Sequence, residues 1–584
     1  MQYSYNFYDS LTEKLERKSG LRESYKYYPD GSIKSAIAEG MRYSYSYYNS
    51  GKLKEKSASG KRLLSYEYDL NGNKIKQTDV TGKTTEYIYN ELDQLQEIHD
   101  GGRCITAFKY NDDGTIKEAV SANGMKNLYG YDTDKNLIKL DIDFNGEILA
   151  QNRYTYDYNG NRTEKQQLQG TTYYTYDSIN QLTNVKYPDY EEQLFYDKAG
   201  NRSKRIVNDV TEHYLYDKRN RLIRQVFEQP TGTTAKHYIY DNAGSLMNDG
   251  EKVYKNDGFN RVTQVTNNKG QVQINRYDAE GLRYEMEENK KLVQFIFNEN
   301  REVVVEKSDS NIKRLIRSYD LWASESEPEK TWYHYASDEQ GSTIFITDKE
   351  KICNKYDYDA WGNLTTCEEI IPNRYLYTGQ QFDQITQQYY LRARYYNPVI
   401  ARFTQEDVYR GDGLNLYTYC DNNPVIYYDP SGYTACSGPK DKNLVEKNPK
   451  KRLPKTNGEW EGARGESKWY SNKQDVIDIT KGEGIPYKGG RPDFSKWRYQ
   501  DDKIDILKFK PGELNGLEKD FGKIENKVKE LKGFKTRREA KEWLRNNELT
   551  GHHKSATEIE LVPTKLHQNV PHIGSASDMR NGFQ

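Results

Sequence analysis

Polar and apolar residues alternate along most of this 584-residue chain. Segments such as TTEYIYN (84–90) and TEHYLYD (211–217) alternate in the manner of half-buried β-strands. Continuous helical periodicity is absent up to about residue 400. The pattern therefore predicts a mainly β structure for the first two thirds of the chain.

A short turn motif separates the predicted strands. It consists of Tyr, then Asp or Asn, two variable residues, and Gly or Asn, which accept a positive φ in a hairpin turn. Tyrosines of this motif recur every 20 or 21 residues, at Tyr8, Tyr28, Tyr48, Tyr68, Tyr89, Tyr110 and Tyr131. A fixed period of this size predicts an array in which each unit packs on its neighbours. We expect the tyrosines to form ladders across the strands, with a sugar-stacking or nucleic-acid-stacking surface as the alternative.

Composition changes this picture in one respect. A mean hydropathy of −1.06 and 30% charged residues are typical of disordered chains, but 53 tyrosines supply amphipathic area with high strand propensity.

The sequence contains no apolar run of 18 residues and no secretory signal pattern at its start. Five cysteines at irregular spacing indicate reduced thiols rather than a disulfide framework.

The pattern changes after residue 433. Residues 434–456 are polar, basic and rich in Pro and Gly, which indicates a linker. Residues 514–533 place Leu517, Phe521, Ile524, Val528 and Leu531 at helical spacing, with Gly533 as the expected C-cap. A second helix is predicted over 536–547, where Thr536 and Glu539 form a capping box.

Half of the eight histidines lie in the segment GHHKSATEIELVPTKLHQNVPHIG, residues 551–574. Imidazole titrates near neutral pH and binds divalent metals, so this cluster is the candidate reactive centre. Residues 441–584 carry 30 Lys and Arg against 23 Asp and Glu, a net charge of +7, whereas residues 1–440 carry 57 against 65, a net charge of −8. A basic tail behind an acidic body favours a polyanionic partner for the tail.

The repeat array resembles YD-repeat (RHS-type) proteins, in which hairpins coil into a hollow β-shell. The resemblance is most specific in YLYTGQQFDQITQQYYLRARYYNPVIARFTQEDVYRGDGLNLYTYCDNNPVIYYDPSGY (375–433), which is similar to the RHS-associated core. The predicted domains are a YD-repeat shell over 1–350, a core over 351–433, a linker over 434–456 and a small α+β domain over 457–584.

The core ends in DPSGY, where RHS proteins and the related C subunits of insecticidal toxin complexes cut their own chain. The family pattern has two aspartates 22 residues apart, and Asp407 and Asp429 fit that spacing, although the first copy reads DVYR instead of DPxG. Two carboxylates held close together cannot both ionise cheaply, so one keeps a proton while the other activates water. The resemblance implies cleavage between Tyr433 and Thr434; the alternative is a simple turn.

The order His-His, strand, His, PHIG resembles the ββα-metal finger of the HNH/endonuclease VII superfamily, particularly its Trp-His-His toxin nucleases. Gly551 stands where Trp is common, and His567 stands where Asn is often found. By this resemblance His553 is the general base, and one divalent ion, Mg²⁺ or Zn²⁺, is held by His552, His567 and His572. The nearby residues Lys554, Lys565 and Arg580 are candidate phosphate contacts. A structural zinc finger without catalysis is the alternative, and YKGGRPDFSKW (487–497) is interpreted as scaffold.

Together these features predict a bacterial toxin for competition between bacteria: a β-shell encloses a C-terminal nuclease and releases it by self-cleavage. The resemblance implies a nucleic-acid substrate, with DNA favoured over RNA, a cognate immunity protein, and secretion or delivery into target cells by a specialised secretion machinery. The rival hypothesis is a YD-repeat adhesion or carbohydrate-binding surface protein with a non-catalytic C-terminal cap.

Overall fold

The computed structural model describes residues 1–6, 10–309, 311–408, 415–437, 458–462, 467–488, 491–510, 513–514, 519–555 and 557–570. The chain divides into two compact units, Met1–Asn443 and Leu444–Gln584. The predicted shell and core both fall in the first unit, and the candidate histidine cluster falls in the second.

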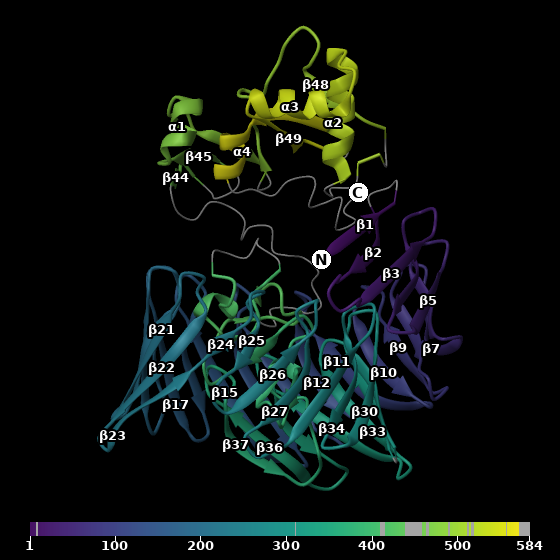
Figure 1. Cartoon of the computed structure of the whole chain (residues 1–584), viewed down its shortest axis with the longest axis vertical. Helices are drawn as coiled ribbons and strands as arrows, with labels where there is room; N and C mark the ends of the chain where they lie inside the picture. The colour runs from purple at the N-terminus through teal and green to yellow at the C-terminus, as the bar shows by residue number, and fades with distance from the viewer. Residues whose placement is uncertain are drawn as a thin grey trace. The chain divides into compact units, whose positions relative to one another are not determined.

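The first unit begins with a 23-stranded sheet in which each strand pairs antiparallel with the next strand along the chain. Figure 1 shows these strands as a succession of long hairpins, beginning in purple with β1. The strands are β1 (Gln2–Tyr5), β2 (Leu11–Leu15), β3 (Arg22–Tyr27), β4 (Ile33–Ala38), β5 (Met41–Tyr47), β6 (Leu53–Ala58), β7 (Lys61–Tyr68), β8 (Lys74–Thr78), β9 (Thr84–Tyr89), β10 (Leu95–Asp100), β11 (Arg103–Tyr110), β12 (Ile116–Ser121), β13 (Lys126–Tyr131), β14 (Leu137–Phe144), β15 (Glu147–Tyr156), β16 (Arg162–Gln167), β17 (Gly170–Tyr176), β18 (Leu182–Lys186), β19 (Glu191–Tyr196), β20 (Arg202–Val207), β21 (Val210–Tyr216), β22 (Leu222–Gln229) and β23 (Gly232–His237).

A 14-stranded sheet continues in the same sequential, antiparallel order. Its strands are β24 (Ile239–Tyr240), β25 (Leu246–Asn248), β26 (Lys252–Asn256), β27 (Val262–Asn267), β28 (Val272–Tyr277), β29 (Arg283–Glu288), β30 (Lys291–Phe297), β31 (Val303–Ser308), β32 (Ile312–Arg317), β33 (Leu321–Glu327), β34 (Thr331–Ser337), β35 (Thr343–Thr347), β36 (Ile352–Tyr358) and β37 (Leu364–Glu369). Short elements follow: η1 (Tyr377–Gly379), β38 (Gln381–Asp383), β39 (Gln388–Tyr390), β40 (Tyr395–Asn397), β41 (Arg402–Phe403), η2 (Cys420–Asn422), β42 (Tyr427–Tyr428) and β43 (Cys436–Ser437).

The repeated motif forms the hairpin turns, as the sequence predicts. In the turn after β7, the Asp69 carboxylate accepts the backbone N–H of Asn73 at 2.8 Å, and Gly72 has a φ of +88°. Asn180 and Asn220 occupy the equivalent positions in other repeats with φ of +67° and +61°. Each turn therefore satisfies its own polar groups locally, and Gly or Asn supplies the left-handed residue.

The motif tyrosines form a ladder between neighbouring hairpins. The hydroxyl of Tyr176 donates to the carbonyl of Arg162 at 2.6 Å, and that of Tyr196 donates to Leu182 at 2.7 Å. Tyr110 and Tyr216 make equivalent bonds to Leu95 and Arg202. These contacts confirm a structural role for these tyrosines, because each hydroxyl that is buried beside the core finds a backbone acceptor.

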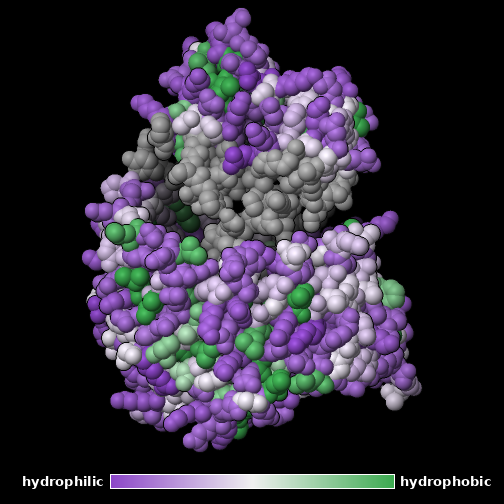
Figure 2. Space-filling view, turned by 180° about the vertical axis from the view of Figure 1, so that it is seen from behind, coloured by the Kyte–Doolittle hydropathy of each residue, from purple (hydrophilic) through white to green (hydrophobic). Residues whose placement is uncertain are grey.

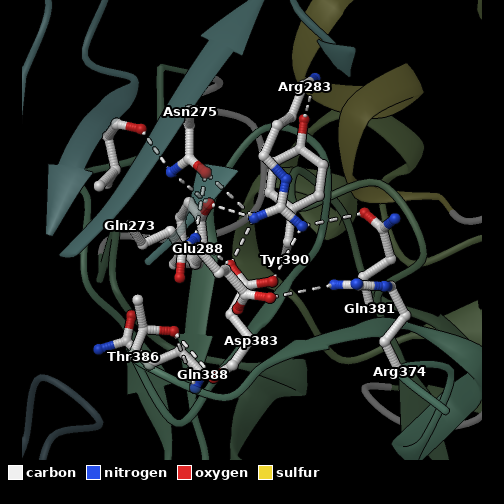
Figure 3. A network of polar contacts seen from close by, with 12 residues as sticks. Gln273, Asn275, Arg283, Glu288, Arg374, Gln381, Asp383, Thr386, Gln388 and Tyr390 are labelled. Carbon is white, nitrogen blue, oxygen red and sulfur yellow. Dashed lines mark hydrogen bonds and ion pairs between the residues drawn. The ribbon is translucent and has the colours of Figure 1, made fainter. Parts of the chain in front are cut away.

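Charged side chains are also built into the core. Arg283 of β29 and Asp383 of β38 are both fully buried and form an ion pair, shown in Figure 3. Asp383 also accepts from the Gln273 amide at 2.7 Å, and the second guanidinium nitrogen of Arg283 donates to Asp383 Oδ1 at 2.9 Å. The network ties the short strands of the core to the second sheet.

The second unit is a small α+β assembly. A sheet of order β44-β45-β46-β47 and a sheet of order β48-β50-β49 make up its strands. Its elements are β44 (Gly458–Trp460), β45 (Lys468–Ser471), α1 (Gln474–Thr480), β46 (Ile485–Lys488), β47 (Arg491–Pro492), β48 (Ile506–Lys508), α2 (Lys519–Lys532), α3 (Arg537–Asn546), β49 (Leu549–His553), β50 (Glu558–Pro563) and α4 (Thr564–Asn569). The order β49, β50, α4 is the strand–strand–helix order predicted around the histidines.

Two predicted helix caps are confirmed, the C-cap of α2 and the N-cap of α3. Gly533 has a φ of +76°, and the N–H of Phe534 donates to the carbonyl of Lys529 at 3.0 Å, which is a Schellman C-cap. Thr536 accepts the N–H of Glu539 at 3.2 Å at the start of α3. The Glu539 carboxylate accepts from Lys535 instead of Thr536, so the capping box is shifted by one residue.

The surface carries apolar residues singly or in small groups among hydrophilic ones, as Figure 2 shows for one face. In the described part of the chain, no helix is both long and apolar enough to cross a membrane.

Candidate functional site

Two candidate sites emerge, one in each unit. In the first unit, the structure brings Asp407 and Asp429 to the same guanidinium. Nη2 of Arg394 lies 2.8 Å from Asp407 Oδ2 and 3.8 Å from Asp429 Oδ2. All three side chains are buried, and the Arg394 guanidinium stacks 3.5 Å from the ring centroid of Phe403. The two aspartates predicted from spacing therefore meet, with an arginine that the sequence did not single out.

The DPSG loop between β42 and β43 is held from both sides. Asp429 Oδ1 accepts the N–H groups of Ser431 and Gly432 at 2.9 and 2.8 Å, so the motif does form a turn. Arg394 Nε donates to the carbonyl of Gly432, and Arg392 donates to that of Pro430. The candidate cleavage residues Tyr433 and Thr434 follow this turn directly, before β43.

The loop also borders a cavity of about 640 Å³ in the first unit. Pro430, Ser431 and Arg392 contribute to its lining. Burial raises the pKa of the Asp429 carboxyl above its usual range, although hydrogen bonds from Ser431 and the charge of Arg394 act in the opposite direction. The two carboxyls therefore differ: Asp407 lies in the closer ion pair with Arg394, whereas the pKa of Asp429 is raised above that of an ordinary aspartate.

In the second unit, the two adjacent histidines of β49 lie on opposite faces of the sheet, because neighbouring strand residues alternate. His552 pairs with Glu560 across the hairpin, and His553 pairs with Ile559. Gly551 lies on the same face as His553, where an added Cβ would come within 2.6 Å of Ile524 Cδ1. A larger residue at position 551 would therefore require the Ile524 side chain to shift.

His553 faces α2 and contacts a buried carboxylate. Its Nε2 lies 3.0 Å from Oδ2 of Asp520, whose side chain is fully buried. Asp520 also accepts from the Lys523 ammonium at 2.9 Å. Sequence reasoning missed Asp520, although a carboxylate four residues before Ile524 on an apolar helical face is a readable signal. The predicted stripe instead included Phe521, which is 50% exposed.

His552 faces the other side, toward α4. Its ring centroid lies 5.3 Å from that of His567, and the buried Phe494 packs 4.9 Å from His552 and 6.2 Å from His567. Phe494 belongs to the segment interpreted as scaffold, and it has that role here. Glu560 is buried opposite His552, burial raises its pKa, and its Oε2 accepts no hydrogen bond from the described residues.

The remaining predicted site residues are dispersed. The Lys554 ammonium lies 3.2 Å from Ser495 Oγ and 4.0 Å from Glu560 Oε2. Lys565 on α4 lies 3.4 Å from the Asp475 carboxylate, and both side chains are exposed. His572 and Arg580 lie outside the described residues. Among the tail residues that the structure describes, no three His, Cys, Asp or Glu ligand atoms lie within 4.8 Å of one another.

The fold of the first unit has known counterparts. Residues 168–425 match the family model described as Teneurin YD-shell. A crystal structure of TcdB2-TccC3 superimposes on 74% of this chain with a TM-score of 0.56 at 16% sequence identity, covering 28% of the solved chain. A second, of TcdB2-TccC3 without the hypervariable C-terminal region, gives a TM-score of 0.54 over 74% of this chain and 27% of the solved chain, also at 16% identity.

The first unit has the fold of a YD-repeat shell. The matched hairpins, turns and closing strands are the elements described above, so the predicted fold class is confirmed for this unit.

Some of the curated proteins that are similar to this chain are named as nucleases. The tRNA(Glu)-specific nuclease WapA of Bacillus subtilis subsp. natto is 33% identical over 371 residues, which is 60% of this chain and 15% of that protein. The tRNA3(Ser)-specific nuclease WapA of Bacillus spizizenii is 28% identical over 371 residues, 60% of this chain and 16% of that protein. The chain thus spans about one sixth of the length of these relatives.

Proposed function

We propose that this protein is a toxin in which a YD-repeat shell carries and releases a C-terminal, metal-dependent nuclease that hydrolyses phosphodiester bonds. The pairing of His553 with the buried Asp520 is the observation that carries the proposal, and the neighbouring imidazoles of His552 and His567 on the other face of the same hairpin support it. The nuclease names of the WapA relatives support it. The sequence-based hypothesis favours DNA, but those names refer to tRNA, so both nucleic acids belong in the test.

His553 has the surroundings of a general base. Because Nε2 lies against Asp520, the carboxylate favours the tautomer that carries hydrogen on Nε2, which leaves Nδ1 to accept a proton from water. Asp520 also stabilises the imidazolium that forms. Proton transfer by a positioned histidine contributes about 10²–10⁴-fold to the rate.

The residues on the opposite face of the sheet offer side chains of the types that bind a divalent metal. His552 and His567 present neighbouring imidazoles, and the buried, under-bonded Glu560 carboxylate lies beside His552. We assign His552 and His567, together with His572, as the residues that would hold the ion. Such an ion would neutralise negative charge on the phosphate and its leaving oxygen. Lys554 and Lys565 would add contacts to the nucleic-acid backbone.

Expression of residues 444–584, the second compact unit, tests the nuclease. We expect degradation of DNA or RNA that is abolished by EDTA and by His553→Ala. Lys541→Ala, at an exposed position on α3, is the matched control and should retain full activity. A folded wild-type unit that degrades neither nucleic acid with any of Mg²⁺, Mn²⁺ or Zn²⁺ would refute the proposal.

Release of this unit would use Asp407 and Asp429. Asp407, paired with Arg394, would take a proton from water. Asp429 in its protonated form would polarise the Tyr433 carbonyl of the scissile bond to Thr434. Water adds to the carbonyl carbon, the C–N bond breaks, and the amine of Thr434 takes up a proton. Arg394 would position both carboxylates and the loop.

A denaturing gel of the full chain tests this release. We expect two fragments from the wild type and one full-length band from Asp429→Asn. The exposed Asp421 supplies the matched control, because Asp421→Asn should still be cut. A wild-type chain that migrates at full length argues against self-cleavage without affecting the nuclease assay.

A further inference from the structure

A hairpin of the shell brings three different metal-ligating side chains together. Strands β10 and β11 are joined by Gly101 and Gly102, which both have positive φ (58° and 79°), as a type I′ turn requires. On β10, just before this turn, His99 Nε2 lies 2.6 Å from a carboxylate oxygen of Glu97. The ligand atoms of Glu97, His99 and Cys104 all lie within 4.8 Å of one another, the one such group of three among the described residues.

A β-bulge creates this arrangement. Glu97 pairs with Ala107 and Ile98 with Thr106, so an unbroken register would place His99 opposite Ile105. The register shifts between Ile98 and His99, and His99 pairs with Cys104 instead. Bulges re-aim side chains and are frequent at functional positions. Without this shift, the thiol would lie opposite Asp100, away from the imidazole.

The hairpin is anchored through its other face. Phe108 packs 5.0 Å from Trp322 in the second sheet, and Asp100 accepts from Arg314 at 2.7 Å. The three ligands point the opposite way, where the His99 side chain is 22% exposed and that of Glu97 is 44% exposed. The site therefore sits on a rigid support and is open to an ion from solution.

We infer that Glu97, His99 and Cys104 form a binding site for one zinc-like divalent cation on the shell. Thiolate, imidazole and carboxylate are the ligands that Zn²⁺ takes in proteins, and a thiolate excludes hard ions such as Mg²⁺ and Ca²⁺. Three protein ligands leave one tetrahedral position for water or an external ligand. On binding, the Cys104 thiol releases its proton to solvent, and the ion joins β10 to β11.

The chain supplies an internal comparison for this site. On β21, the Nε2 of His213 lies 3.4 Å from Glu228 of the neighbouring strand, with no cysteine in the group. Cys367 is an exposed cysteine without a histidine in such a cluster. His213→Ala and Cys367→Ser therefore change the same residue types without touching the proposed site.

Titration of the reduced, metal-free full chain with Co²⁺ tests the inference. A thiolate-to-cobalt absorption band reports only cysteine-bound metal, so metal at the tail histidines does not contribute. We expect a band that saturates at one equivalent, that Zn²⁺ removes, and that Cys104→Ser abolishes. His99→Ala should weaken binding by at least the roughly 10–100-fold that loss of an outer-shell partner causes, while His213→Ala and Cys367→Ser should match the wild type. No band in the wild type, or a band that survives Cys104→Ser, overturns the inference.

A second measurement covers the case in which Cys104→Ser does not fold. Zn²⁺ should slow alkylation of Cys104 in the wild-type chain, measured by peptide mass spectrometry, and should have no such effect in His99→Ala. Equal alkylation rates with and without Zn²⁺ in the wild type contradict the site. Neither experiment depends on nuclease activity.

Discussion

The shell and the tail each contain a fully buried aspartate, and the two are paired differently. Asp383 in the shell accepts from both arms of the Arg283 guanidinium and from Gln273. Asp520 in the tail accepts from His553 and from the partly exposed Lys523. Both carboxylates have 0% exposure, so burial alone does not distinguish them.

The partner distinguishes them. A guanidinium stays charged at all ordinary pH values and holds a carboxylate in a fixed fork, which makes the Asp383 network a rigid structural element. An imidazole gains and loses a proton near neutral pH, so the Asp520 carboxylate beside His553 orients a group that can transfer protons. We therefore assign the Arg283–Asp383 pair to the architecture of the shell, and we propose the Asp520–His553 pair for chemistry.

Removing the shell aspartate should have the largest effect. Asp383→Ala leaves the fully buried Arg283 without its counter-charge, and we expect a loss of about 3–5 kcal/mol of unfolding free energy. Urea unfolding of the full chain measures this loss. Asp383→Asn, which keeps the shape and one acceptor, should lose less, and equal stability of Asp383→Ala and the wild type would contradict a structural role.

Removing the tail aspartate should instead slow the proposed reaction. Asp520→Asn keeps the side-chain shape but no longer holds or stabilises the imidazolium, and we expect kcat to fall about 10–100-fold with little change in KM. Steady-state kinetics of residues 444–584 provide the readout. Lys523→Met is the matched control, because Lys523 contacts Asp520 without a described contact to His553. If both variants lose activity equally, Asp520 is not a positioning residue.

The shell could be predicted largely from sequence because its determinants are local. The turn aspartate, the residue with positive φ and the ladder tyrosine all lie within one repeat, so their period is visible. The contacts between the sheets are not local. Arg314 binds Asp79 and Asp100, which precede it by 235 and 214 residues, and nothing in the surrounding sequence marks them as partners.

The candidate sites were predictable to a similar extent. The structure brings Asp407 and Asp429, predicted from spacing, to one guanidinium. Of the predicted histidines it brings His552 and His567 together, whereas His553 faces the other side of the sheet and His572 lies outside the described residues. Arg394 and Asp520 were missed because each comes from a separate element. Helical spacing assigned the buried face of α2 to Phe521, but the helix turns Asp520 inward, where it meets His553. Tertiary contacts, not periodicity, decide that rotation.

A pH dependence should separate the two regions further. Burial, reinforced by neighbouring acids, raises the pKa of Asp278 to about 7 and those of Asp338 and Asp359 to about 6. In the unfolded chain these groups titrate near 4, so between about pH 4 and 7 these three aspartates bind more protons in the folded shell than in the unfolded chain. The single buried His334 opposes them, because burial lowers its pKa to about 4. The stabilisation from the three aspartates is fully present below the unfolded-state pKa of about 4, and it is lost as the pH rises through the folded-state pKa values of about 6 and 7.

We therefore expect the unfolding free energy of the shell to fall from pH 5 to pH 7, by at most about 1.4 kcal/mol per pH unit for each extra bound proton. Urea unfolding at pH 5, 6 and 7 checks the slope. Asp359→Asn removes one titrating group and should flatten it. A shell that becomes more stable over this range would show that other groups dominate.

The smallest effect should come from a single turn of the shell. Gly31 has a φ of +87° with no atom within 4 Å of an added Cβ, so Gly31→Ala tests backbone strain alone. We expect a loss of about 1 kcal/mol, from the left-handed conformation that alanine disfavours. Gly31→Asn should cost less, because Asn180 and Asn220 occupy the same turn position with positive φ. Neither variant should change the nuclease rate measured on the full chain. If the nuclease rate of the full chain instead falls together with the unfolding free energy of the Gly31 variants, the shell contributes to the chemistry. The shell would then not be architecture alone.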